Sequence, residues 1–262
     1  MKTVFASLCR NILLLGMLTT VVVGCSGQQE TFTDLEQLNN KSFAVPTGTI
    51  ADDLVLTRFP EAQFQYFNSV VDAALAVKAG RVDVAAYDEP ILRNIAAKTS
   101  GLRVLSGMIT EDSYGFAVRL GEQDLKATID AVVDELRAGE DYQRMMARWL
   151  PEKGAPAPMP EIETGNQGVL RFGTAAVTEP FSFIDGSMEV VGIDIEIASL
   201  VAKRLNKRLE VVNMEFGALI PALAASKVDM IGACITISDE RAKKVLFSQP
   251  YYTGGIAALV RK

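Results

Sequence analysis

The sequence predicts an α/β fold made of two lobes of similar construction. Apolar strands alternate with helical segments from Lys41 to Trp149, and the alternation starts again at Val169. The segments ALAVKAGRVDVAAYDEP and IPALAASKVDMIGACIT each place a helix, a basic residue, Val-Asp and an apolar strand in the same order. Such alternation is typical of a parallel or mixed sheet covered by helices.

The first half contains four expected strands, at residues 42–45, 64–67, 82–87 and 114–120. Helical periodicity covers residues 50–59, 69–80 and 122–149. A further helix opens at Asp88-Glu89-Pro90, where the proline suits the first helical position.

The second half has the same kind of order. Strands are expected at residues 169–174, 209–214 and 228–234, with helices at Ile193–Leu205 and 217–226. The stretch WLPEKGAPAPMPEIETGNQGVLRF between the halves holds four prolines. Residues 151–168 are therefore expected to form an extended linker.

The N-terminus has the pattern of a secretory signal. Ile12 to Val23 is mostly apolar, follows Lys2 and Arg10, and is too short to span a bilayer. Its ending, VVGC, resembles a bacterial lipoprotein lipobox. Residues 1–24 are then a signal peptide, residues 25–34 a tether, and Cys25 the lipidated residue of a periplasmic or cell-surface lipoprotein whose membrane contact is this anchor. A plain signal peptide is the alternative.

The composition excludes several kinds of chemistry. The chain has no histidine, so catalytic triads that use histidine and zinc sites that contain it are excluded. Cys9 is removed with the signal and Cys25 carries lipid, so Cys234 has no partner for an intramolecular disulfide. The net charge of −6 disfavours nucleic acid as a partner. No metal and no cofactor are expected.

Polar residues follow the last strand of the second half, in MIGACITISDER. Ligands of open α/β sheets bind beyond the carboxyl ends of the strands, beside helix N-termini. Arg241 follows the possible N-cap Ser238 and opposes the helix dipole, a penalty that a bound anion would reverse. One hypothesis is that Arg241 binds a carboxylate while Thr236 and backbone N–H groups complete the contact. The alternative is a solvated arginine paired with a neighbouring acid.

The first half offers polar side chains at similar places. Tyr87 and Asp88 lie where the strand 82–87 ends. Asp88 either accepts hydrogen bonds from a ligand ammonium group or caps the helix that follows. Thr47 and Thr49 lie in a turn beside another helix, which is a weak signal by itself.

Thr178 and Phe216 complete the candidate set from the second half. Thr178 follows a strand, and Phe216 precedes the helix 217–226, where an aromatic belongs to the core more often than to a ligand platform. One arginine, one aspartate and several threonines at strand ends suit a zwitterion held between two lobes. A free amino acid is the simplest such ligand.

Long segments of the chain resemble the polar amino-acid family of bacterial solute-binding proteins, the extracellular receptors of ABC importers. They are RFGTAAVTEPFSFIDGSMEVVGIDIEIASLVAKRL, FGALIPALAASKVDMIGACITISDERAKKVLFSQPYYTGG and FAVPTGT…AGRVDVAAYDEP. The resemblance implies a two-lobed type II periplasmic-binding-protein fold of the Venus-flytrap kind. It also implies a monomeric binding protein, not an enzyme, that delivers an amino acid to permease subunits.

The family's binding residues can be carried over position by position. The arginine of ITISDER and the threonine five residues before it hold the ligand carboxylate in the family, which implies Arg241 and Thr236 here. The ammonium would be held by the Cys234 main-chain oxygen and by Asp88. Thr49 would donate to the carboxylate and Phe216 would pack against the ligand.

Two positions depart from the family pattern. Ala175 stands where receptors for cationic amino acids carry an aspartate, and Thr178 stands where many members have a stacking aromatic. The resemblance therefore implies a polar or small amino acid rather than a cationic one.

The order of the segments is also exchanged, because the part resembling 169–262 comes first in the family. This implies a circular permutation in which the linker 151–168 joins the family's usual ends, with Ala257–Arg261 crossing to lie near Tyr114–Arg119. Lobe A is expected to comprise 35–118 with the strand 255–262, and lobe B 119–150 with 169–254. The alternative is a fragment of tandem binding domains.

Two other functions stay open. The fold also hosts periplasmic dehydratases, in which Glu179 or Glu89 would have to be the general acid, although neither has an evident activating partner. A ligand-sensing module is the third possibility, but no signalling segment is evident in the 262 residues.

Overall fold

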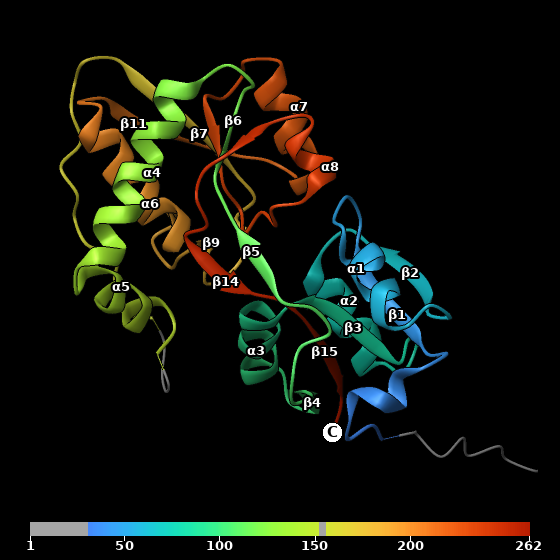
Figure 1. The fold of residues 1–262 in the computed structure, drawn as a ribbon. Coiled ribbons are helices and arrows are strands. Elements are labelled where there is room, and N and C mark those ends of the chain that lie inside the picture. Colours follow the sequence, from blue (N-terminus) through green and yellow to red (C-terminus); the bar gives the residue numbers. More distant parts are fainter. Residues whose placement is uncertain (1–30, 152–155) are drawn as a thin grey trace, which may run out of the picture. The chain divides into compact units, whose positions relative to one another are not determined.

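The computed structural model describes residues 31–151 and 156–262 (Figure 1). The predicted signal peptide and the lipidation site Cys25 lie outside the described residues. Within these ranges, no helix is long and apolar enough to cross a membrane.

The first of two five-stranded sheets has the strand order β2-β1-β3-β15-β4. β1 (Ser42–Pro46) runs parallel to β2 (Gln63–Phe67) and β3 (Val84–Asp88), whereas β15 (Ile256–Arg261) lies antiparallel between β3 and β4 (Leu102–Val104). The helices α1 (Ala51–Arg58), α2 (Val70–Lys78) and α3 (Glu89–Lys98) pack against it, and the 3-10 turn η1 (Leu35–Leu38) precedes it. β3 and β15 are buried almost throughout, as their continuous apolar sequences require.

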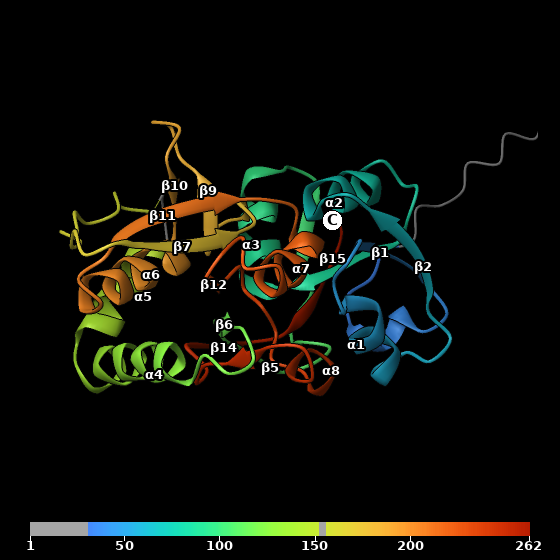
Figure 2. The same cartoon turned by 90° about the horizontal axis from the view of Figure 1, so that it is seen from above.

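The second sheet has the order β11-β7-β12-β6-β13. β7 (Val169–Thr174) runs parallel to β11 (Arg208–Asn213) and β12 (Met230–Ile231), and β6 (Ala117–Val118) lies antiparallel between β12 and β13 (Leu246–Phe247). Figure 2 shows α4 (Gln123–Ala138) and α5 (Asp141–Trp149) near α6 (Ile193–Arg204), which packs on β11. α7 (Leu219–Ala224) packs on β7 and β12.

Smaller elements complete the fold. β8 (Val177–Thr178), β9 (Ser182–Ile184) and β10 (Val190–Val191) form a three-stranded sheet, η2 (Phe216–Ala218) precedes α7, and α8 (Asp239–Ala242) precedes β13. The antiparallel ribbon of β5 (Asp112–Tyr114) and β14 (Tyr252–Gly254) pairs Tyr114 with Tyr252. Figure 1 shows this ribbon between the two larger sheets, where the chain crosses twice.

The α/β class predicted from the sequence is confirmed, and the expected helices are present, but two strands differ. Residues 114–120 are divided into β5 and β6, because Gly115 turns away and donates its N–H to the Ile235 carbonyl at 3.0 Å. The strand expected at 228–234 is observed only at Met230–Ile231, and Cys234, with a φ of +56°, lies outside the extended region.

Two expected neighbours also differ. Ala117 and Val118 pair with β12 and β13, so β6 belongs to the second sheet and not to the lobe that was expected to end at residue 118. β15 enters the first sheet, but Tyr114 pairs with Tyr252 rather than with residues 257–261. The reason is that β5 and β14 pair with each other in the ribbon, where the chain passes from one large sheet to the other.

Candidate functional site

Seven of the nine predicted ligand-binding residues surround one small cavity of about 10 Å³. They are Thr49, Tyr87, Asp88, Phe216, Cys234, Thr236 and Arg241. Ile50, Ala51 and Ile256 complete the lining. A cavity of this size holds about one water molecule. We call it the anchor cavity, and an amino acid enters it only if its walls move apart.

Thr47 and Thr178, the two remaining predicted residues, line a neighbouring pocket of about 450 Å³. The anchor cavity and this pocket share Thr49, Tyr87 and Phe216 as lining residues. At its edge a Cβ placed on Gly48, whose φ is +80°, would lie 3.2 Å from the Gly217 Cα. The turn before α1 and the start of η2 therefore touch backbone to backbone, beside the place where a ligand would enter.

Arg241 is held by the residues that precede it. The Ser238 hydroxyl caps α8 by accepting the Arg241 backbone N–H at 3.3 Å. The guanidinium donates from Nη1 to the Thr236 carbonyl at 3.1 Å and lies 5.4 Å from the centre of the Phe216 ring. It is 8% exposed, and burial lowers its pKa. Within the described residues its guanidinium forms no salt bridge, although Asp88 and Glu240 lie near enough to act on its pKa in the direction opposite to burial.

Asp88 ends β3 and occupies the N-cap position of α3, but its side chain makes no capping hydrogen bond. Instead Oδ1 accepts a hydrogen bond from the Tyr114 hydroxyl. Asp88 is 4% exposed, and burial raises its pKa to about 7, although the Tyr114 bond acts in the opposite direction. Burial also raises the pKa of Tyr87, with Asp88 adding to the effect.

Asp194 belongs to the surroundings of the site, although sequence reasoning missed it. This residue of the first turn of α6 is fully buried, and its Oδ2 accepts the Cys234 N–H at 3.0 Å. The bond fixes the left-handed Cys234 peptide beside the anchor cavity. The available signal was an acid between two isoleucines in GIDIEIA, since a carboxylate inside an apolar stretch needs a buried partner.

The predicted threonines differ in what their hydroxyls contact. The Thr49 hydroxyl donates to the Pro46 carbonyl at 2.9 Å, and that of Thr178 lies 3.2 Å from the Ala175 carbonyl. Each must give up its present acceptor before it can donate to a ligand. Thr236 is 7% exposed, and its backbone pairs with Tyr114 in an isolated bridge.

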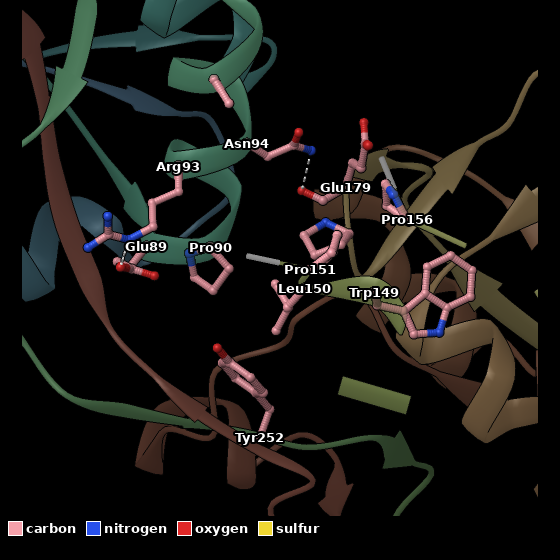
Figure 3. A pocket seen from close by; sticks show the side chains of 12 residues that line it. Glu89, Pro90, Arg93, Asn94, Trp149, Leu150, Pro151, Pro156, Glu179 and Tyr252 are labelled. Carbon is pink, nitrogen blue, oxygen red and sulfur yellow. Dashed lines mark hydrogen bonds and ion pairs between the residues drawn. The ribbon is translucent and has the colours of Figure 1, made fainter. Parts of the chain in front are cut away.

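Figure 3 shows another pocket, of about 680 Å³, which is lined by residues of α3, the end of α5 and the turn at Glu179-Pro180. Glu89 and Glu179, the two possible general acids, both line it. Glu89 pairs with Arg93, and Glu179 pairs with Lys98 at 2.5 Å. Asn94 donates to the Glu179 carbonyl at 3.4 Å, so α3 is tied to the β8–β9 turn (Figure 3). Between residues 31 and 151 and between 156 and 262, no group of three acidic or cysteine side chains is arranged to hold a metal.

Comparison with known proteins gives matches to part of the chain. Residues 170–262 match the family model "Bacterial extracellular solute-binding proteins, family 3". The arginine-binding extracellular protein ArtP of Bacillus subtilis (strain 168) is 36% identical over 100 residues, which is 38% of each chain. The L-cystine-binding protein TcyJ of Escherichia coli (strain K12) is 34% identical over 96 residues, 37% of this chain and 36% of the relative. The chain thus matches little more than a third of these relatives' length.

Solved structures give matches of similar extent. The arginine-bound form of domain 1 from TmArgBP is 40% identical, with a TM-score of 0.33 over 37% of this chain and 82% of that one. An ancestral arginine-binding protein bound to arginine is 44% identical, with a TM-score of 0.32 over 33% of this chain and 38% of that one.

These relatives are named as amino-acid-binding proteins, and the matched residues include Phe216, Cys234, Thr236 and Arg241 from the anchor cavity. The mixed α/β sheets agree with the two-lobed periplasmic-binding fold that the sequence predicted. Residues 170–262 are thus similar to the bacterial extracellular solute-binding proteins, family 3.

Proposed function

We propose that this protein is an extracytoplasmic binding protein that captures one free amino acid in a widened anchor cavity and delivers it to an ABC importer. Arg241 and Thr236 bind the ligand carboxylate, and Asp88 and the Cys234 main-chain oxygen bind the ammonium. Thr49 and Thr47 add donors, while Tyr87, Phe216 and Thr178 surround the side chain. The protein acts as a monomer, catalyses no reaction and is held to its membrane by lipid on Cys25.

The observation that carries this proposal is the buried guanidinium of Arg241 without a carboxylate partner among the described residues. Asp88 acts on the guanidinium without forming a salt bridge with it, and a buried cation without a directly bonded counter-charge is costly. A bound carboxylate would reduce that cost. Asp88, in the same cavity wall, has the opposite need, because burial disfavours its charged form. A zwitterion would satisfy both residues, because its carboxylate can pair with Arg241 and its ammonium group with Asp88.

For the ligand side chain we propose a polar or small group. Ala175, where the resemblance leads one to expect an aspartate in receptors for cationic ligands, is apolar and buried. The neighbouring pocket offers the hydroxyls of Thr47 and Thr178. Calorimetry with serine, glutamine, cystine and arginine discriminates the classes, and the tightest binding to arginine would contradict this part of the proposal. Native mass spectrometry of the purified protein would identify a ligand that co-purifies.

The test of the anchor is Arg241→Ala. Loss of a charge-assisted contact of about 1.5–3 kcal/mol should weaken amino-acid binding by roughly tenfold to more than a hundredfold. Arg144→Ala is the matched control, because Arg144 pairs with Glu140 and Asp141 on exposed helix surface. Equal calorimetric affinity in the Arg241 variant and the wild type would exclude this anchor.

We also propose that the chain is a circularly permuted binding domain rather than a fragment of tandem domains. The linker supports this, because Ala157 donates to the Arg148 carbonyl and Gln167 to the Asn206 carbonyl, at 3.2 and 2.7 Å. It therefore runs from the end of α5 to the end of α6. A protease site inserted between Pro160 and Gly165 tests the idea by size exclusion. After cleavage a permuted domain stays in one folded piece that binds ligand, whereas separation of the two halves would contradict permutation.

A further inference from the structure

The ribbon of β5 and β14 between the two large sheets, which we call the hinge, carries a side chain that reaches the proposed ammonium subsite. Tyr114, the last residue of β5, is fully buried, and its hydroxyl donates to Asp88 Oδ1. The buried thiol of Cys234 also lies beside the Asp88 carboxylate, and burial and then Asp88 raise the pKa of that thiol. Tyr114 thus holds Asp88 through one of its two carboxylate oxygens.

The backbone of Tyr114 is tied to the opposite anchor. Tyr114 forms a bridge with Thr236, and the flanking bonds run from Gly115 N–H to the Ile235 carbonyl at 3.0 Å and from Ile237 N–H to the Ser113 carbonyl at 2.8 Å. One residue of the ribbon therefore contacts Asp88 through its side chain and Thr236 through its main chain. Tyr114 therefore contacts both ends of the proposed zwitterion site.

Packing around the ring of Tyr114 fixes the orientation of its hydroxyl group. It stacks on Tyr252 with centroids 5.7 Å apart and meets Phe181 edge-on at 5.8 Å. A Cβ placed on Gly254 would lie 2.9 Å from the hydroxyl oxygen, so the glycine makes room for it. Rotation of the ring would cost these contacts, and the hydrogen bond to Asp88 is held in place by packing.

We infer that Tyr114 is a positioning residue that holds the Asp88 carboxylate in its charged, ligand-accepting orientation and couples it to the hinge. This inference rests on the proposed function only for the identity of the group that Asp88 binds. The effect is electrostatic as well as steric, because a hydrogen bond to a carboxylate stabilises its ionised form.

The charged and titratable groups around Asp88 fix the expected direction. They are Tyr87 on its own strand, Asp112 and Tyr114 on β5, Tyr252 on β14, Cys234, and Arg241 on α8. Burial and Asp112 raise the pKa of Asp88, and the Tyr114 bond and Arg241 lower it. Removal of the hydroxyl should raise the pKa of Asp88 further, so more of the protein would carry neutral Asp88 near pH 7.

The test is Tyr114→Phe, with Tyr142→Phe as the matched control. The Tyr142 hydroxyl donates to the Tyr251 carbonyl at 2.8 Å and has no contact with Asp88. In ligand-free protein labelled with ¹³C-aspartate, the NMR titration midpoint of Asp88 should rise in Tyr114→Phe and stay constant in Tyr142→Phe. Amino-acid affinity at pH 6.5 should fall about tenfold in Tyr114→Phe, with a smaller loss at pH 8.5.

The outcomes separate the two proposals. An unchanged Asp88 midpoint in Tyr114→Phe overturns the inference, whether or not an amino acid binds. An affinity loss that is the same at both pH values assigns Tyr114 a purely structural role and also overturns it. Absence of amino-acid binding by the wild type refutes the proposed function, while the titration still tests Tyr114. If Tyr114→Phe does not fold, Asp88→Asn tests the same contact, since it should abolish the pH dependence of affinity near neutrality.

Discussion

The two large sheets have the same topology but provide opposite charges to the site. In each, three parallel strands are followed by an antiparallel strand from a distant part of the chain and by an edge strand that runs in the direction of the first three. The first sheet supplies Asp88 directly at the end of β3, and α3 begins at the next residue. The second supplies Arg241 ten residues after β12, beyond an irregular segment. The topology thus brings the two strand ends to the proposed site, and the segment that follows each strand supplies the charged side chain.

The irregular segment between β12 and α8 is held by a buried acid, Asp194, and the segment after β3 has no equivalent residue. Asp194 accepts the Cys234 N–H, and the buried Tyr251 hydroxyl lies near enough to its carboxyl group to act against burial on its pKa, although the two groups do not meet in good hydrogen-bond geometry. Burial raises the pKa of Asp194 to about 7. A protonated Asp194 therefore stabilises the folded state below the unfolded pKa near 3.8, and this contribution is lost as pH rises through about 7.

Asp194→Asn should produce the largest change in stability. Asparagine resembles the protonated acid and offers an amide NH₂ to Tyr251, so its energy in the folded state does not depend on pH. Between pH 5 and pH 8 the free energy of unfolding of the variant should gain about 2–3 kcal/mol relative to the wild type. Urea denaturation at the two pH values measures the gain.

Glu196→Gln is not a suitable control, because Glu196 is bonded to Arg148 and Trp149, whereas Asp72→Asn changes an exposed helix-start acid of the first half. The Asp72 variant should keep the pH dependence of the wild type. A stability difference between Asp194→Asn and the wild type that stays constant with pH would contradict the burial of an ionisable Asp194.

The fold and the site differed in how far sequence could predict them. The alternation of apolar strands and helices was enough for the α/β class, and strand ends were enough to single out Asp88 and Arg241. The strand boundaries near Gly115 and Cys234 were predicted wrongly, because a turn and a positive φ at a non-glycine residue leave no periodic signal in the sequence. Tyr114 was assigned to a strand, but its bond to Asp88 depends on a packing direction that periodicity does not encode.

A smaller difference in stability is expected at the opposite end of the two sheets, where β3 and β12 begin. Asp83 and Asp229 occupy equivalent positions directly before β3 and β12, and each accepts a backbone N–H of the neighbouring strand, from Ser42 of β1 at 3.0 Å and from Arg171 of β7 at 2.9 Å. Asp229 alone also forms an ion pair, with Arg171 Nη2 at 2.6 Å. Burial acts to raise the pKa of Asp229, but the bonds from Arg171 outweigh it and the pKa is lowered.

Asp229→Ala should therefore cost about 1–2 kcal/mol of unfolding free energy at neutral pH, and Asp83→Ala about 1 kcal/mol. The contribution of Asp229 is present above its unfolded pKa and is lost as pH falls through the lower folded pKa, so the cost of Asp229→Ala should shrink below pH 4. Salt should reduce the cost at Asp229 and leave that at Asp83 nearly constant, because only the former contains an ion pair. Equal costs with equal salt dependence would mean that the two strand-start acids act through the backbone bond alone, and that the charge of Arg171 adds nothing to the second sheet.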